Sequence, residues 1–262
     1  MRIMKKALVI AVVMMTVPFL ALAGEAITGQ KAIENVYNRP AGDDMQSDLT
    51  MTLTNSRGQS RVRKMAQFSK DFGKIEKKIM FFKYPADVRG TSFMTWSYDE
   101  AGRDDDQRIY LPALKKVKRI SSDSKSDYFM GSDFTYDDLG DRHPAEDIHK
   151  LLREEMIEGE SCYVVESTPR EDEYIYSKTV TWIIKDKWID LKKSFYDEDG
   201  DHLKTLMVKK YENISGFWII THSQMNNIQK KHTTDMQLSK VKVNSGIANR
   251  QFTERMMRRG VR

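Results

Sequence analysis

Side chains that could do chemistry are few and scattered in this 262-residue sequence. The sequence contains no Gly-x-Ser-x-Gly nucleophile motif, no His-Glu-x-x-His zinc motif and no glycine-rich phosphate loop. An enzyme of this length would be expected to show a nucleophile, an acid/base pair or metal ligands on loops. We therefore expect no catalytic residue, no metal site and no cofactor.

Three weaker signals have simpler interpretations. His202, His222 and His232 fall on strands predicted to be neighbours, so a shared metal site is conceivable, but surface or hydrogen-bonded histidines are the better interpretation. The acidic residues 99–106 lack the glycine and terminal glutamate spacing of a calcium-binding EF-hand loop, which favours a solvated hairpin. The only cysteine, Cys162, lies in an apolar run and is interpreted as a buried, inert thiol.

The first 23 residues have the pattern of a secretory signal peptide. A basic start (Arg2, Lys5, Lys6) precedes an apolar run over residues 7–20 and the small-x-small site Ala21-Leu22-Ala23. Cleavage would leave residues 24–262 as one exported domain, and no cysteine follows the site to carry a lipid anchor. A membrane anchor is the alternative interpretation, but this run is short and contains Pro18.

Composition predicts a water-soluble protein with a real core, because 40% of the residues are hydrophobic, 31% are charged and the mean hydropathy is −0.60. Removing the three basic residues of the leader lowers the formal charge from +5 to +2. Much of the basicity therefore belongs to the leader, which argues against nucleic-acid binding.

Hydrophobic periodicity predicts a mainly β protein. From about residue 44 apolar and polar residues alternate with a period of two, as in Leu49, Met51 and Leu53, and turn signals recur between the runs. The pattern gives roughly ten short strands, with amphipathic helices over residues 28–38 and 251–259. We expect one antiparallel sheet, strongly curled, with a short helix near each end of the chain.

A segment over residues 108–140 carries the one specific resemblance. In the order IYLPALKKVKRI, then FMGSDFTYDDL, it resembles the LolA-like outer-membrane lipoprotein-sorting proteins, in the branch associated with RND-type membrane exporters. The resemblance implies a half-open antiparallel β-barrel (LolA/LolB-like), a periplasmic location and a carrier rather than an enzyme. Elsewhere the match is one of pattern only.

The resemblance and the strand phases together predict three groups of site residues. The lipid cavity is expected to be lined by the more apolar phase of each strand: Leu49, Met51, Leu53, Met80, Phe82, Met94, Trp96, Trp182, Met207, Trp218, Met236 and Leu238. The gate residues, packed inward at the rim, are Phe129, Phe134, Tyr136 and Leu139. The docking strip, pointing outward, is Lys115, Lys116, Lys118 and Arg119.

The expected partners are the acyl chains of a lipid or lipoprotein, an RND-type exporter and, transiently, a membrane surface. We expect a monomer. Methionine adapts its shape to floppy chains, but a barrel filled by its own side chains would use the same residues. A cargo-free adaptor or sensor that docks on a membrane protein therefore remains the alternative, and a solvated strand face remains the alternative for the lysines.

Overall fold

The structure, a computed structural model, describes residues 26–261. The predicted signal peptide lies outside these residues. The strands are β1 (Asp44–Thr54), β2 (Ser60–Asp71), β3 (Ile75–Tyr84), β4 (Ser92–Tyr98), β5 (Asp106–Leu111), β6 (Lys116–Arg119), β7 (Asp147–Ile157), β8 (Glu160–Pro169), β9 (Lys178–Ile184), β10 (Asp190–Tyr196), β11 (His202–Ile214), β12 (Phe217–Asn227) and β13 (His232–Val243). The helices are α1 (Gly29–Tyr37) and α2 (Glu254–Arg259). Short 3-10 turns cover Pro112–Leu114, Ser122–Ser124, Phe129–Gly131, Asp137–Leu139, Pro144–Glu146 and Asn249–Gln251.

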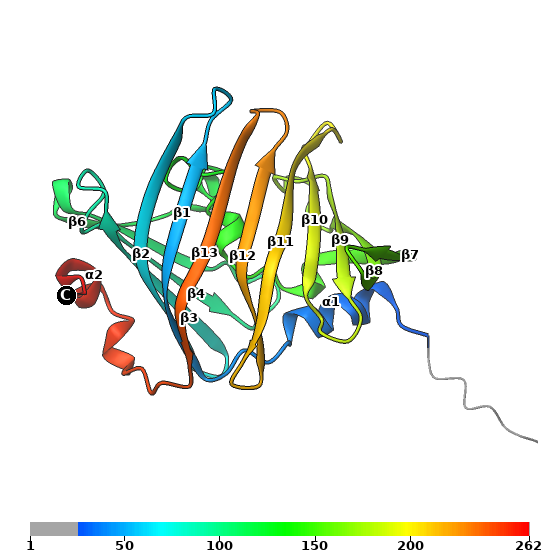
Figure 1. The fold of residues 1–262 in the computed structure, drawn as a ribbon, viewed down its shortest axis with the longest axis horizontal. Coiled ribbons are helices and arrows are strands. Elements are labelled where there is room, and N and C mark those ends of the chain that lie inside the picture. The colour runs from blue at the N-terminus through cyan, green and yellow to red at the C-terminus, as the bar shows by residue number, and fades with distance from the viewer. Residues whose placement is uncertain (1–25, 262) are drawn as a thin grey trace, which may run out of the picture.

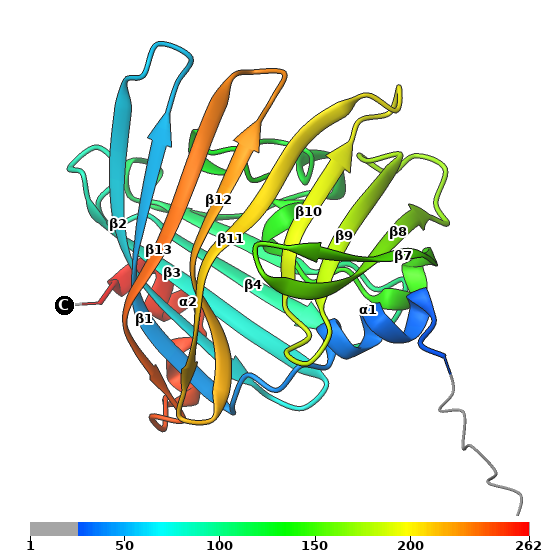
Figure 2. The same cartoon turned by 45° about the vertical axis from the view of Figure 1, so that its right-hand side comes forward.

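All thirteen strands belong to one antiparallel sheet, in the order β6-β5-β4-β3-β2-β1-β13-β12-β11-β10-β9-β8-β7. β1 and β13 pair with each other, so the two ends of the strand meander meet in the middle of the sheet. The sheet bends so that β3 and β4 cross behind the layer formed by β1 and β9 to β13 (Figures 1 and 2). Its end strands, β6 and β7, do not pair with each other, so the barrel is half-open, as the sequence predicted.

The inner face of the sheet is defined here as the side that carries Leu49, Met51 and Leu53. These β1 side chains are at most 5% exposed and form one apolar cluster with Met65, Phe82, Phe93, Ile109 and Phe129. The alternating burial of β1 is what a period-two strand with one buried face should show. The long connection between β6 and β7 lies against this face, because it supplies Phe129 to the cluster.

The two helices cover opposite faces. Thr28 caps α1 by accepting a hydrogen bond from the Lys31 amide, and Ala32 is buried against Val165 and Ile183 on the inner face. Gly29 permits this packing, because a Cβ there would lie 2.7 Å from the Leu151 backbone nitrogen. α2 lies on the outer face, where Phe252 and Met257 pack against β3 and β4. It is shorter than the predicted helix, because a separate 3-10 turn ends at Gln251.

Asp44, the first residue of β1, fixes the path of the chain from β13 to α2. Its buried carboxylate accepts hydrogen bonds from the backbone N–H groups of Ser245, Gly246 and Ile247, at 2.7, 3.0 and 2.9 Å. Burial alone would raise the pKa of this carboxyl, but the hydrogen bonds from Ile247 and Ser245 outweigh burial, so the net pKa is lowered.

We expect Asp44→Asn to lower the free energy of unfolding by about 1–3 kcal/mol at neutral pH, the usual effect of leaving buried donors with a poorer acceptor. A carboxyl whose folded pKa is depressed stabilises the protein above its unfolded pKa of about 3.9 and loses that contribution as the pH falls through the folded value. Urea unfolding at pH 7 and at about pH 3 should therefore show the difference shrinking in acid. An equal deficit at both pH values would contradict this role.

Candidate functional site

The gate segment, residues 128–139, is an ordered loop that lies across the inner face. Tyr128 and Thr135 form an isolated antiparallel bridge, and the Phe129 amide donates to the Phe134 carbonyl at 2.7 Å. Met130 and Gly131 turn the chain at its tip, both with positive φ. The segment is therefore a compact unit with its own backbone hydrogen bonds, and only side-chain contacts attach it to β11, β12 and β13.

The four gate residues point inward. Phe129 has no solvent exposure, and its ring lies 5.0 Å from that of Phe93 and 6.0 Å from that of Phe82, measured between centroids. Phe134, 6% exposed, enters a second apolar cluster with Phe195 and Met225. Tyr136 and Leu139 are partly buried against the first cluster, and Leu139 also contacts the second. The gate segment thus fills the inner face with its own side chains.

A buried ion pair holds the gate segment in place. Lys204 on β11 has no exposed side-chain surface, and its Nζ pairs with the carboxylate of Asp138, which is 5% exposed. The same Nζ donates to the Asp133 carbonyl at 3.1 Å. Asp138 also accepts from the Tyr176 hydroxyl at 2.9 Å and from the Thr135 amide at 2.7 Å. Each charge is therefore matched by further hydrogen bonds, as a buried pair requires.

A second polar contact attaches the gate segment to β13. The Asp133 carboxylate accepts from the Thr234 hydroxyl at 2.7 Å and lies 2.6 Å from Nδ1 of His232. The Asp133 amide in turn donates to the Thr234 hydroxyl at 2.9 Å. Lys204, Asp138, Asp133, His232 and Thr234 are called the clamp below. Sequence reasoning missed it, because a lysine in the middle of an alternating strand carries no mark of burial.

Seven of the predicted cavity residues lie in the apolar cluster of the inner face. They are Leu49, Met51, Leu53, Met80, Phe82, Met236 and Leu238. They come from β1, β3 and β13, and Met236 also contacts the second cluster around Phe134. In β1 and β13 the apolar phase is the inward phase, which is why the alternation located these residues. β3 is apolar on both faces, because Ile79 and Phe81 pack on its outer side.

The structure corrects the placement of the other five predicted cavity residues, which face outward. Met94 and Trp96 pack on the outer face with Phe252 and Met257 of the α2 region. Trp182 and Trp218 belong to a further cluster with Val164. Met207 lies opposite Lys192 of β10 and next to Leu206, which packs in the inner cluster around Phe134, so strand alternation turns Met207 outward. The reason is that β4 and β9 are buried in both phases and their more apolar phase packs on the outer face, so the apolar phase does not mark the inward side of these strands.

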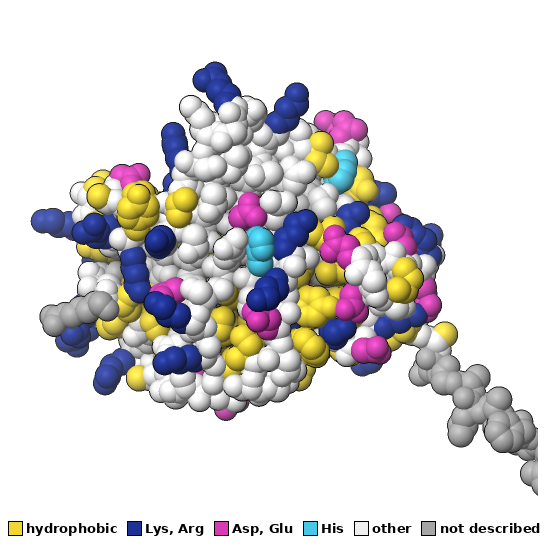
Figure 3. Space-filling model, viewed as in Figure 1, with side chains coloured by type: hydrophobic (Ala, Val, Ile, Leu, Met, Phe, Trp, Pro, Cys, Tyr) yellow, Lys and Arg dark blue, Asp and Glu magenta, His cyan; other side chains and the backbone are white. Residues whose placement is uncertain are grey.

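The outer face combines a polar area with a smaller apolar one. Figure 3 looks onto it and shows basic side chains spread over the face, acidic and histidine side chains among them near its middle, and apolar side chains gathered toward the α1 end of the sheet. Lysines cover several aromatic rings there: Lys192 Nζ lies 4.1 Å from the Trp182 ring centroid, and Lys187 contacts Tyr211 and Trp218.

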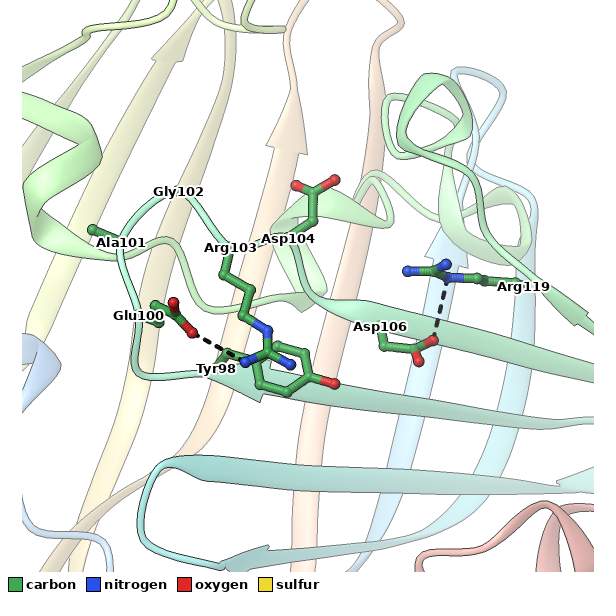
Figure 4. A pocket seen from close by; sticks show the side chains of 8 residues that line it. All are labelled: Tyr98, Glu100, Ala101, Gly102, Arg103, Asp104, Asp106 and Arg119. Carbon is green, nitrogen blue, oxygen red and sulfur yellow. Dashed lines mark hydrogen bonds and ion pairs between the residues drawn. The ribbon is translucent and has the colours of Figure 1, made fainter.

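All four residues of the docking strip are exposed. Lys116, Lys118 and Arg119 lie on β6, an end strand of the sheet, and Lys115 forms the turn before it. Arg119 pairs with Asp106 at 3.5 Å and borders a charged hollow of about 500 Å³ at the turn between β4 and β5 (Figure 4). Arg103 lies over the Tyr98 ring in this hollow and pairs with Glu100 at 3.0 Å.

The other chemical candidates are occupied by ordinary contacts. His222 pairs with Asp235 at 3.1 Å, and His202 bonds to Thr205. Within residues 26–261 no three His, Cys, Asp or Glu side chains are placed to hold a metal ion. Cys162 is buried, and burial raises the pKa of its thiol to about 11. Over the same residues no helix has the length and apolar character needed to cross a membrane.

Comparison with protein families decides where this chain belongs. Residues 3–141, more than half of the chain, match DUF1329, a family described as a protein of unknown function. The chain belongs to the DUF1329 family. Residues 74–259 also match a family described only as an uncharacterised protein. A search of curated proteins finds no match.

Solved structures support this membership and extend the fold comparison. A DUF1329 family protein from Desulfovibrio piger is 30% identical, with a TM-score of 0.83 over 87% of this chain and 97% of the other. A protein from Vibrio parahaemolyticus, provisionally described as an outer membrane lipoprotein-sorting protein domain, is 33% identical, with a TM-score of 0.82 over 88% and 98%. A LolA superfamily protein from Nitrosomonas europaea, at 22% identity, has a TM-score of 0.67 over 87% and 98%, which establishes the shared fold alone.

The clamp can be tested without any ligand. We expect Lys204→Met to lower the free energy of unfolding of this DUF1329 protein by about 3–5 kcal/mol, because the Asp138 carboxylate would stay buried without its partner. The double variant Lys204→Met with Asp138→Asn should recover part of that loss, because it removes the stranded charge. Urea unfolding of the four proteins forms a double-mutant cycle. Additive effects would show that the two side chains are not coupled.

Proposed function

We propose that this protein is a periplasmic carrier that binds the acyl chains of a lipid or lipoprotein on the inner face of its sheet and moves them between membranes. An RND-type exporter is the proposed membrane partner, and the carrier is proposed to act as a monomer without bond chemistry. The observation that supports the proposal best is the composition of the inner face: one apolar surface, contributed by β1 to β5 and β13, lies beneath a loop that only side-chain contacts attach.

Hydrophobic transfer explains why such a surface suits acyl chains. Each methylene left in water costs about 0.8 kcal/mol, so a long chain needs a continuous apolar surface during transfer. The methionines among the inner-face residues, Met51, Met65, Met80 and Met236, can adapt to chains of different shape. The likeness to the Vibrio protein described as a lipoprotein-sorting domain supports the same class of cargo.

Cargo and gate segment would compete for the same surface. Phe129 contacts Phe82 and Phe93, so an acyl chain lying there requires Phe129 to withdraw. The clamp holds the empty protein closed, because its ion pair and hydrogen bonds fasten the gate segment to β11 and β13. When the segment leaves, water can replace these polar contacts. In this account loading exchanges the apolar contacts of the gate residues for those of the cargo.

A cargo-free adaptor is the second candidate, and one observation favours it. Phe129 has no solvent exposure, so the inner face is filled by the protein itself in this structure. An adaptor would use the barrel only as a rigid base that presents the docking strip to a membrane protein. The two candidates differ in whether the inner face accepts an amphiphile, which the next experiment measures.

Replacing Met236 by Asp should abolish amphiphile uptake, because a carboxylate would interrupt the inner apolar face. Met207→Asp is the matched control, since Met207 is also partly buried on a neighbouring part of the sheet but faces outward. Uptake is measured by displacement of a fluorescent fatty acid and by native mass spectrometry, with circular dichroism to verify folding. Equal uptake by the two folded variants would contradict the carrier; no uptake by the unaltered protein would favour the adaptor.

Reversing charge in the docking strip should weaken membrane contact while leaving amphiphile capacity unchanged. We expect Lys116→Glu with Lys118→Glu to reduce binding to vesicles containing phosphatidylglycerol, most strongly at low salt, because exposed charges are screened over roughly 10 Å at 0.1 M. Lys209→Glu with Lys210→Glu makes the same change of charge at exposed positions on β11. Cosedimentation measures both, and an equal loss in the two variants would show that net charge alone, not the strip, drives binding.

A further inference from the structure

Arg63 is a charged residue placed on the apolar inner face. It lies on β2 opposite Met51 of β1, and strand alternation puts it on the same side as Met65. Met51 and Met65 are 0% and 1% exposed. β3 ends at Tyr84, opposite Lys64, so the flank of Arg63 away from β1 is bordered by the turn that follows β3. That turn contributes Val88 to the inner apolar cluster.

The guanidinium of Arg63 lacks a full set of partners. Its Nη1 is buried and has no hydrogen-bond acceptor within residues 26–261. Burial lowers the pKa of Arg63, Asp87 acts from a distance to raise it, and Arg61 lowers it further. Most buried donors in native proteins are satisfied, and a buried cationic donor without an acceptor is among the most costly exceptions.

Other charges near Arg63 favour an anion. Arg61, two residues earlier on the same face of β2, is exposed, and Arg89 is exposed in the turn that follows β3. Asp87 is the one acidic residue of that turn. The surroundings of Arg63 are therefore net positive, and they border the inner apolar cluster that contains Met51 and Met65. A planar guanidinium at such a boundary is suited to a carboxylate or phosphate group, which accepts two parallel N–H bonds.

We propose that Arg63 binds the anionic headgroup, carboxylate or phosphate, of an amphiphile whose acyl chain lies over Met51, Met65 and Phe82. This inference rests on the proposed carrier function and narrows its cargo to amphiphiles with a negative headgroup. Arg63 sets specificity in this arrangement: the apolar face supplies affinity for the chain, and the guanidinium distinguishes charged from neutral heads.

The test compares matched ligands and matched variants. Oleate, lysophosphatidic acid with an oleoyl chain and neutral monoolein share one acyl chain and differ in the headgroup, and inorganic phosphate carries the headgroup chemistry alone. Arg63→Met removes the charge but keeps an unbranched side chain, and Arg63→Lys keeps the charge without the planar fork. Arg61→Met is the control, because Arg61 shares the strand and the face but is exposed. Binding is measured by calorimetry on the full mature chain.

The unaltered protein is expected to bind the two anionic amphiphiles more tightly than monoolein. Arg63→Met should weaken anionic binding about tenfold or more while leaving monoolein unchanged, as expected for loss of a charge-assisted hydrogen bond. Arg63→Lys should fall between, and Arg61→Met should resemble the unaltered protein. Inorganic phosphate should not bind measurably without a chain; phosphate binding that Arg63→Met abolishes would instead assign a site for free anions and overturn the headgroup inference.

Ligand-free stability gives an independent measurement. Because Nη1 has no acceptor, Arg63→Met should melt at the same temperature as the unaltered protein or higher, whereas a structural arginine would make it melt lower. A lower melting temperature together with equal loss of charged and neutral amphiphiles would overturn the proposal. Binding of neither kind of amphiphile to the unaltered protein would refute the carrier function itself, and equal binding of both kinds would refute only the role of Arg63.

Discussion

The charge of a lysine with no exposed side-chain surface needs hydrogen-bond acceptors inside the protein. In this protein the gate segment supplies them. Lys204 projects from β11 into the inner side of the barrel, where Asp138 and the Asp133 carbonyl receive its charge. Without residues 128–139 in place, that ammonium would face apolar rings, including those of Tyr176 and Phe195 at 5.1 Å. Together with the contacts of Asp133 to His232 and Thr234, this pair holds the gate segment on the inner face, where Phe129 packs in the apolar cluster.

A carrier of this kind needs an apolar surface that contacts the cargo when loaded and is shielded from water when empty. The inner face meets the first condition through the methionines and aliphatic residues of β1, β2, β3 and β13, and the gate residues meet the second. Polar contacts suit the fastening because water can replace them when the segment leaves, whereas apolar contacts need another apolar partner. When the gate segment leaves, water therefore replaces the polar contacts of the clamp and cargo replaces the apolar contacts of the gate residues.

Alternation predicted the fold and part of the site, and its failures have a physical cause. β1 is apolar on one side only, so Leu49, Met51 and Leu53 revealed the inner face, and the gate residues stood out as large apolar side chains in a loop. Met94 and Trp182 lie in strands covered on both sides, where phase carries no information. Lys204 and Arg63 could not be located, because burial of a charge depends on partners distant in sequence, such as Asp138, or on the absence of one.

Hydrogen exchange at the gate segment tests the central claim, that the inner face binds acyl chains by displacing this loop. The amides of Phe129, Asp133 and Tyr136 donate to Phe134, Thr234 and Asp127, and so report whether the segment is seated. The account predicts that saturating oleate or lysophospholipid speeds exchange at these amides while the paired amides of β1 and β13 stay protected. Unchanged protection of the gate segment in protein shown to hold the amphiphile would contradict it.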